Sequence, residues 1–366
     1  MKSVSAPAGP RTARPGAAPG ARPLLAAGLL LLPLLAACGE DHVSRYPQTT
    51  FAPTTEMGEI QIGLFNLTLW LGIVVGLLTF AGLGYILWKF RYRPDAPEPR
   101  QVHGNTTLEV AWTLIPALIV AVIAVFTVQA IFATQPERPH NALDVRVIGK
   151  QWWWEFQYPV NGGRDTVITA NEIHVPVGQP VNLILETDNV LHSFWVPQMA
   201  GKRDLITNRV NHLIFTPREP GVYLGQCAEF CGDSHALMKM RMIAHTPQGF
   251  QDWLNNEARP ALEPTDSTSA VALGKKLVTQ GACAGCHVIQ GTPMVGRQGP
   301  SLTHFGRRRT LAAGILENNA QNLHAWIRDA PAIKPGSLMP QLGGDIPNGL
   351  TEEQITYIVA YLQSLQ

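Results

Sequence analysis

The stretch from Cys227 to Met238 reads Cys-Ala-Glu-Phe-Cys-Gly-Asp-Ser-His-Ala-Leu-Met and holds two cysteines, a histidine and a methionine. Thiolate, imidazole and thioether groups form a soft ligand set, which favours copper over hard cations. Their spacing of four, four and three residues would also suit one buried face of a helix. However, the Gly-Asp-Ser sequence at 232–234 favours a turn. The alternating residues of 222–226 predict a strand that leads into a loop.

A second half-site lies upstream, where Val-Leu-His-Ser-Phe-Trp-Val-Pro at 190–197 places His192 in an apolar run. With His192 included, the set becomes two cysteines, two histidines and a methionine. This is a blue-copper-like set with one additional thiolate, and two thiolates can bridge two copper ions. A Cys227–Cys231 disulfide and a zinc site remain as alternatives.

These motifs resemble those of subunit II of the haem–copper cytochrome c oxidases, which carries a dinuclear copper centre called CuA. The resemblance implies six metal ligands: His192, Cys227, the backbone carbonyl of Glu229, Cys231, His235 and Met238. It also implies that the side chain of Glu229 helps to hold a magnesium ion at the interface with subunit I. Quinol-oxidase relatives lack the two cysteines, so a cytochrome is the expected electron donor.

The amino terminus predicts an export signal in residues 1–37. Basic residues precede an apolar run at 24–37, which is too short for a membrane span and is followed by Cys38. The sequence Leu-Ala-Ala-Cys at 35–38 resembles a lipoprotein cleavage box, so cleavage before Cys38 and lipidation of this cysteine are expected. An ordinary signal peptide and an uncleaved anchor are the alternatives.

Two long uncharged stretches predict a transmembrane hairpin over 60–132, with helices at about 60–88 and 110–132. The connecting loop, 89–109, carries four basic residues, whereas the external segment 38–59 carries one. Since positive charge is retained in the cytoplasm, the loop is expected there and both ends outside. The expected location is therefore the bacterial inner membrane, with the later domains on its outer, periplasmic face.

Glu109 stands at the cytoplasmic start of the second predicted span. A carboxylate at this position is favourable for the helix dipole alone. The resemblance implies a further role for Glu109 at the mouth of a proton channel in subunit I.

Residues 133–258 are expected to form the copper domain. Several short alternating segments separated by Pro and Gly predict a β-sandwich, and the resemblance implies an all-β Greek-key cupredoxin fold. The aromatic segment Gln-Trp-Trp-Trp-Glu-Phe-Gln-Tyr at 151–158 would point its alternate rings to opposite faces of a strand. The resemblance implies that Trp152 is the residue where electrons enter the copper centre.

A linker is expected at 259–269, followed by an all-α domain at 270–366. Cys283-Ala-Gly-Cys286-His287 is the motif of covalent c-type haem attachment. A redox dithiol or half of a zinc site are the alternatives for the cysteine pair. Cys283 and Cys286 would hold the haem, and His287 would bind its iron.

Met339 is the best candidate for the sixth iron ligand, because Met294 follows His287 too closely to cross easily to the opposite face of the haem. A His/Met pair raises the haem potential. Gly-Pro-Ser-Leu at 299–302 resembles the cytochrome c loop whose proline carbonyl orients the proximal histidine. The pattern is that of a class I cytochrome c, closed by a helix over 351–365.

The resemblance implies subunit II of a cytochrome c oxidase with a fused cytochrome c. Electrons would pass through haem c and CuA to the haem–copper site of subunit I, where oxygen is reduced with proton translocation. The expected partners are subunits I and III, membrane lipid, and a cytochrome c or a quinol–cytochrome c reductase as donor. A formal charge of +1 gives no reason to expect nucleic acid. The rivals are a nitric oxide reductase subunit and a membrane-anchored copper chaperone.

Overall fold

The computed structural model describes residues 46–95, 97–98 and 101–366. The expected signal segment 1–37 and Cys38 lie outside these residues. Residues 48–366 belong to one structural unit.

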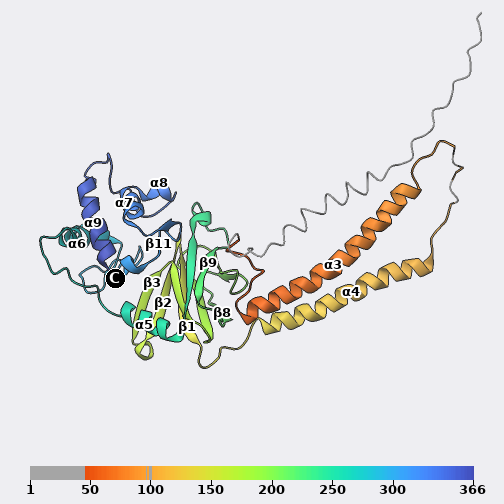
Figure 1. The fold of residues 1–366 in the computed structure, drawn as a ribbon, viewed down its shortest axis with the longest axis horizontal. Helices are drawn as coiled ribbons and strands as arrows, with labels where there is room; N and C mark the ends of the chain where they lie inside the picture. Colours follow the sequence, from red (N-terminus) through yellow and green to blue (C-terminus); the bar gives the residue numbers. More distant parts are fainter. Residues whose placement is uncertain (1–45, 96, 99–100) are drawn as a thin grey trace, which may run out of the picture. The chain divides into compact units, whose positions relative to one another are not determined.

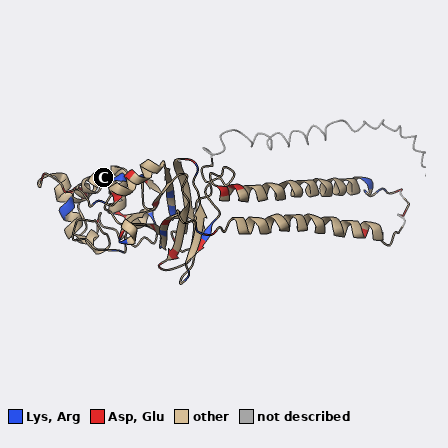
Figure 2. Ribbon diagram, turned by 90° about the horizontal axis from the view of Figure 1, so that it is seen from below, with Lys and Arg blue, Asp and Glu red and all other residues tan. Residues whose placement is uncertain are grey.

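Two long apolar helices, α3 (Glu56–Lys89) and α4 (Thr106–Ala133), form the predicted hairpin (Figure 1). Both are long and apolar enough to cross a membrane, and Figure 2 shows charged residues only near their ends. The side chain of Thr55 accepts a hydrogen bond from the backbone of Gly58, and that of Asn105 accepts one from Leu108. These N-caps let each helix begin four residues before the uncharged stretch.

Residues 143–245 form two five-stranded sheets, ordered β3-β2-β1-β5-β8 and β4-β10-β9-β6-β7. The pairs β1–β5 and β4–β10 are parallel, and the other pairs are antiparallel. The strands are β1 (Leu143–Lys150), β2 (Trp153–Val160), β3 (Asp165–Ala170), β4 (Glu172–Pro176), β5 (Val181–Thr187), β6 (His192–Trp195), β7 (Arg203–Leu205), β8 (Asn211–Phe215), β9 (Gly221–Cys227) and β10 (Lys239–His245).

The core follows the alternation of the strands. Trp154, Phe156 and Tyr158 of β2 are fully buried, so one set of rings in the aromatic segment fills the core. Strands β3 and β4 are separated by Asn171, whose φ is 61°. The side chain of Asn171 accepts a hydrogen bond from the backbone of Trp154, which ties this bend to β2.

The carboxy-terminal part is helical and has its own core. Gly274 of α6 packs on α9 so closely that a Cβ atom there would lie 1.9 Å from the carbonyl oxygen of Tyr357.

The predicted fold class, a membrane hairpin followed by a β-sandwich and a helical domain, is confirmed. The elements after the sandwich are α5 (Pro247–Glu257), α6 (Ala270–Gln280), α7 (Ala320–Arg328), α8 (Ala330–Ile333), α9 (Glu352–Ser364), and the short strands β11 (Thr310–Leu311) and β12 (Leu316–Glu317).

Two histidines, the buried His174 and the half-buried His245, lie together where α5 packs on β4 and β10. Nδ1 of His174 is 2.8 Å from Nε2 of His245, and the His174 ring stacks on Trp253 with centroids 4.1 Å apart. Burial lowers the pKa of His174 well below its ordinary value, and the nearby charges of His245 and Arg309 act in the same direction. Burial also lowers the pKa of His245. Both imidazoles are therefore neutral in the folded chain at neutral pH.

We expect this pair to make the fold less stable in mild acid. An unfolded imidazole titrates near about pH 6.5, so below this pH the unfolded chain binds more protons than the folded one, and stability falls as the pH falls. Thermal unfolding of the whole chain should show a lower Tm at pH 5.5 than at pH 7.5. The variant His174→Gln should reduce this difference, whereas removal of the exposed His140 by His140→Gln should not. Equal pH dependence in the two variants would contradict the assignment.

Candidate metal centres

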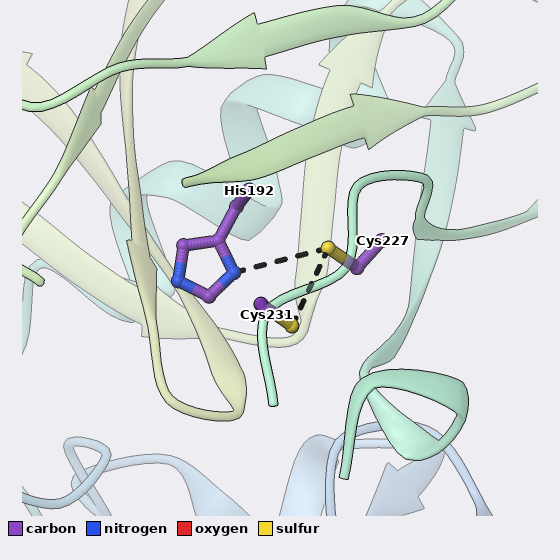
Figure 3. Close-up of side chains that lie close together, drawn as sticks. All are labelled: His192, Cys227 and Cys231. Carbon is purple, nitrogen blue, oxygen red and sulfur yellow. Dashed lines mark hydrogen bonds between the residues drawn. The ribbon is translucent and has the colours of Figure 1, made fainter. Parts of the chain in front are cut away.

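Three predicted copper ligands lie together at one end of the sandwich. Sγ of Cys227, at the end of β9, is 3.8 Å from Sγ of Cys231 and 3.8 Å from Nδ1 of His192, at the start of β6 (Figure 3). All three residues are buried, and their donor atoms lie within 4.8 Å of one another. The two thiols are free and do not form a disulfide.

The other three predicted ligands surround the same two sulfur atoms. The carbonyl oxygen of Glu229 is 3.2 Å from Sγ of Cys227. Nδ1 of His235 is 3.5 Å and Sδ of Met238 is 3.9 Å from Sγ of Cys231. The 3-10 turn His235–Leu237 brings the last two residues back toward the cluster. Two thiols, two imidazoles, a thioether and a carbonyl are a donor set that fits copper.

The two thiols do not lose their protons equally. Their shared hydrogen bond lowers the pKa of Cys227, and hydrogen bonds from His192 and backbone groups support this shift. The same bond and burial raise the pKa of Cys231. One thiolate therefore forms readily, but a second beside it needs compensating positive charge, which bound metal ions would supply.

Residues that the sequence did not point to hold the predicted ligands in place. Oδ1 of Asn189 is 3.1 Å from Nε2 of His192, which leaves Nδ1 directed at Cys227. Nε2 of Gln151 and Nε1 of Trp152 donate hydrogen bonds of 2.8 Å and 2.9 Å to the carbonyl oxygen of Cys231. Neither Asn189 nor Gln151 belongs to the ligand motif, so no sequence signal marked them as supporting residues.

The side chain of Glu229, which is expected to help hold a magnesium ion at the interface with subunit I, is partly exposed, and this role stays a prediction. Oε2 of Glu229 lies 3.9 Å from the ammonium group of Lys202, and the side chain is 41% exposed. Among the described residues, the side chains that cluster closely enough to hold a metal ion are those of His192, Cys227 and Cys231, and Glu229 does not belong to this cluster.

The second candidate centre is a cradle in the helical domain. Cys283 lies in the 3-10 turn Ala282–Gly285, and Cys286 and His287 follow directly. Nδ1 of His287 donates to the carbonyl oxygen of Pro300 at 2.7 Å, which leaves Nε2 free to bind iron. Gly299 is needed beside this ring, because a Cβ atom there would lie 2.5 Å from Cε1 of His287. Burial lowers the pKa of His287, which favours the neutral, metal-binding imidazole.

Met339 lines the same cavity as His287, but Met294 does not. Met294 is instead 2% exposed and packs in the core of the domain. The cavity has apolar walls that suit a porphyrin, and it also receives the side chains of Arg308 and Lys334, which the sequence did not single out. Its apolar lining includes Leu302, Phe305, Leu311, Trp326 and Leu342.

Trp152 joins the two candidate centres. It lines the haem-type cavity, and its indole nitrogen is hydrogen-bonded to the carbonyl of Cys231. Trp152 precedes β2 and is only half-buried, unlike Trp154. The chain thus presents one aromatic ring to both sites.

A membrane hairpin, a soft-metal cluster in a β-sandwich and a haem-type cradle point to the class of membrane-anchored electron-transfer proteins. Three families match in chain order. Residues 48–130 match the transmembrane domain of cytochrome c oxidase subunit II, residues 160–244 match its periplasmic domain, and residues 271–366 match cytochrome c.

Relatives agree with these matches over most of the chain. The chain is 38% identical to cytochrome c oxidase subunit 2 of Alkalihalophilus pseudofirmus, over 80% of this chain and 83% of the relative. It is 34% identical to that of Bacillus sp. strain PS3, over 93% and 96%. The crystal structure of the periplasmic domain of subunit II of cytochrome oxidase from Bradyrhizobium japonicum matches with 29% identity and a TM-score of 0.30, over 32% of this chain and 95% of that one. The chain belongs to the cytochrome c oxidase subunit II family and has a cytochrome c domain at its carboxy terminus.

Proposed function

We propose that this chain accepts electrons for a cytochrome c oxidase and passes them to subunit I through two centres of its own. Cys283, Cys286, His287 and Met339 would hold a covalent haem c. His192, Cys227, the carbonyl of Glu229, Cys231, His235 and Met238 would hold a dinuclear copper centre. When bound, these groups supply one-electron chemistry at positions that the protein fixes.

The shared position of Trp152 carries this proposal. Its indole ring faces the haem-type cavity, and its Nε1–H donates to the carbonyl of Cys231, a predicted copper ligand. A short hydrogen-bonded route therefore leads from the haem-type cavity to the predicted copper ligands. Trp152 would be the residue through which electrons reach the copper centre.

The surrounding residues keep this route fixed while electrons pass. Gln151 and Trp152 both donate to the carbonyl of Cys231, and Pro300 and Asn189 orient the imidazoles of His287 and His192. A ligand set that hardly moves between oxidation states needs little reorganisation when an electron arrives.

The membrane arrangement belongs to the same proposal. The hairpin would place both centres on the periplasmic face of the bacterial inner membrane, with subunits I and III as neighbours and a cytochrome c or a quinol–cytochrome c reductase as donor. Glu109 would lie at the mouth of a proton channel in subunit I. In the structure its carboxylate accepts a hydrogen bond from the backbone of Asn105, a helix-capping contact that explains the residue locally.

Metal analysis and spectroscopy of the purified complex test the proposal directly. We expect two copper ions and one haem per chain, a haem that stays attached in acid–acetone, and a mixed-valence copper signal. A reductant that reaches haem c should then reduce the copper centre and drive oxygen uptake. One copper ion or none, or an extractable haem, would refute it.

The same preparation separates the rival functions. A copper chaperone would show mononuclear copper and no electron transfer from the haem. A nitric oxide reductase subunit would show both centres but would co-purify with a partner that reduces nitric oxide and not oxygen.

A further inference from the structure

A short segment of the cytochrome domain, Lys334–Gly336, lies against the copper loop. The hydroxyl of Ser234 donates to the carbonyl of Pro335. Gly336 has a φ of 76°, and a Cβ atom there would lie 2.8 Å from Cη2 and Cζ3 of the Trp152 indole. The segment therefore contacts both the loop that carries predicted copper ligands and the ring that joins the two centres.

Lys334 is buried in this contact. It is 4% exposed, and its ammonium group donates to the carbonyl oxygen of Trp152. Burial lowers the pKa of Lys334 to about 7. Lysine is rarely buried to this extent, because desolvation of its charge is costly and a neutral carbonyl compensates only in part. Stability alone would favour an apolar residue at this position.

The segment is also coupled to Met339, three residues after Gly336. The backbone of Ser337 donates to the carbonyl of Lys334 at 3.1 Å, and that of Met339 donates to the hydroxyl of Ser337 at 3.2 Å. These turns form one short connection between the buried ammonium group and the thioether that lines the haem-type cavity. A shift at Lys334 would therefore move Met339 relative to Trp152.

We propose that Lys334 is a positioning residue for electron transfer within the chain, holding the segment that carries Met339 against Trp152. This inference rests on the proposed function. In the step that it would serve, one electron would pass from a reduced haem held by His287 and Met339 to oxidised copper held by Cys227 and Cys231, so that the loss at one group would equal the gain at the other. No proton or further reactant is needed.

The two domains are also joined at a second place, so Lys334 can be tested without separating them. Glu172 of β4 is 2% exposed, and its carboxylate accepts hydrogen bonds from the backbone amides of Arg309 and Thr310 and from the Thr310 hydroxyl. The guanidinium of Arg241 donates to the carbonyl of Gly314. These contacts would remain after Lys334 is replaced.

The test uses Lys334→Met in the assembled complex, with the exposed Lys276→Met as the matched control. Methionine is similar in length and suits a buried position, but it cannot donate a hydrogen bond. We expect the variant to keep wild-type haem and copper contents. The rate of electron transfer from haem to copper should fall about tenfold or more, because small displacements carry large kinetic penalties. Amide hydrogen exchange over 334–339 should become faster. Lys334→Gln, which retains an N–H donor, should recover part of the rate. Lys276→Met should match wild type.

The results that would overturn the role of Lys334 differ from those that would refute the proposed function. An unchanged rate and unchanged exchange in Lys334→Met would overturn the inference. If Lys334→Met does not assemble, Gly336→Ala decides, because its methyl group would press on the Trp152 ring and displace the same segment. A slower transfer with intact centres would support the inference, and a wild-type rate would overturn it. Failure of wild-type complex to pass electrons from haem to copper would instead refute the proposed function.

Discussion

Replacement of Cys231 by serine is expected to abolish the dinuclear copper centre. Sγ of Cys231 lies near three other donor groups, those of Cys227, His235 and Met238, so its loss would remove one of the two sulfur atoms around which the donors gather. Serine is a hard and weakly acidic donor that cannot bridge two copper ions. Copper content should fall from two ions to one or none per chain, and electron transfer to subunit I should fall more than the roughly 10–100-fold that changes around metal ligands produce.

Two methionines of the same region supply the matched comparison. Met238 lies 3.9 Å from Cys231, whereas Met240, two residues further along the chain, is equally buried and packs beside Gly225. Met238→Leu should change the copper spectrum and potential, and Met240→Leu should leave both unchanged. A Cys231→Ser protein that keeps two copper ions and a mixed-valence signal would exclude the proposed centre.

Replacement of Met339 by leucine is expected to remove the sixth ligand of the haem iron. Methionine ligation raises the haem potential, so Met339→Leu should lower it by a sizeable part of the roughly 0.8 V range that axial ligands span. The haem would remain attached through Cys283 and Cys286 but would donate poorly to copper. Redox titration of the haem and the loss of its methionine–iron absorption band measure the effect.

Met294 provides the control for this experiment. It is buried in the core of the same domain and does not line the cavity, so Met294→Leu should cost some stability and leave the haem potential unchanged. If Met294→Leu instead lowered the potential and Met339→Leu did not, the assignment of the sixth ligand would be wrong.

The donor residues of both centres could be selected from the sequence because they stand in short motifs. Cys227, Cys231, His235 and Met238 fall within one loop, and Cys283, Cys286 and His287 are almost adjacent. His192 was found as a lone histidine in an apolar run. The structure brings these donors together, while their binding of copper and haem stays a prediction.

The residues that support these donors could not be found in this way. Gln151 and Lys334 act through contacts between segments that lie far apart in the chain. Asn189 contacts His192 only three residues away, but it stands outside the ligand motif, and all three residue types are common on protein surfaces. The fold was easier to predict, because hydropathy fixes the hairpin and alternation fixes most strands. The short strands β6 and β7 cannot be recognised in this way, because four and three residues give too little periodicity.

The buried carboxylate of Glu172 limits how freely the haem module could be exchanged. Its oxygens accept hydrogen bonds from three groups of the cytochrome domain: the backbone amides of Arg309 and Thr310 and the hydroxyl of Thr310. In a chimaera that carries an unrelated cytochrome domain, the buried carboxylate of Glu172 would lose these hydrogen-bond donors. The loss would lower the stability of the folded chain by about 1–3 kcal/mol or more. A replacement cytochrome domain would therefore need donor groups in the positions of the Arg309 and Thr310 amides and the Thr310 hydroxyl.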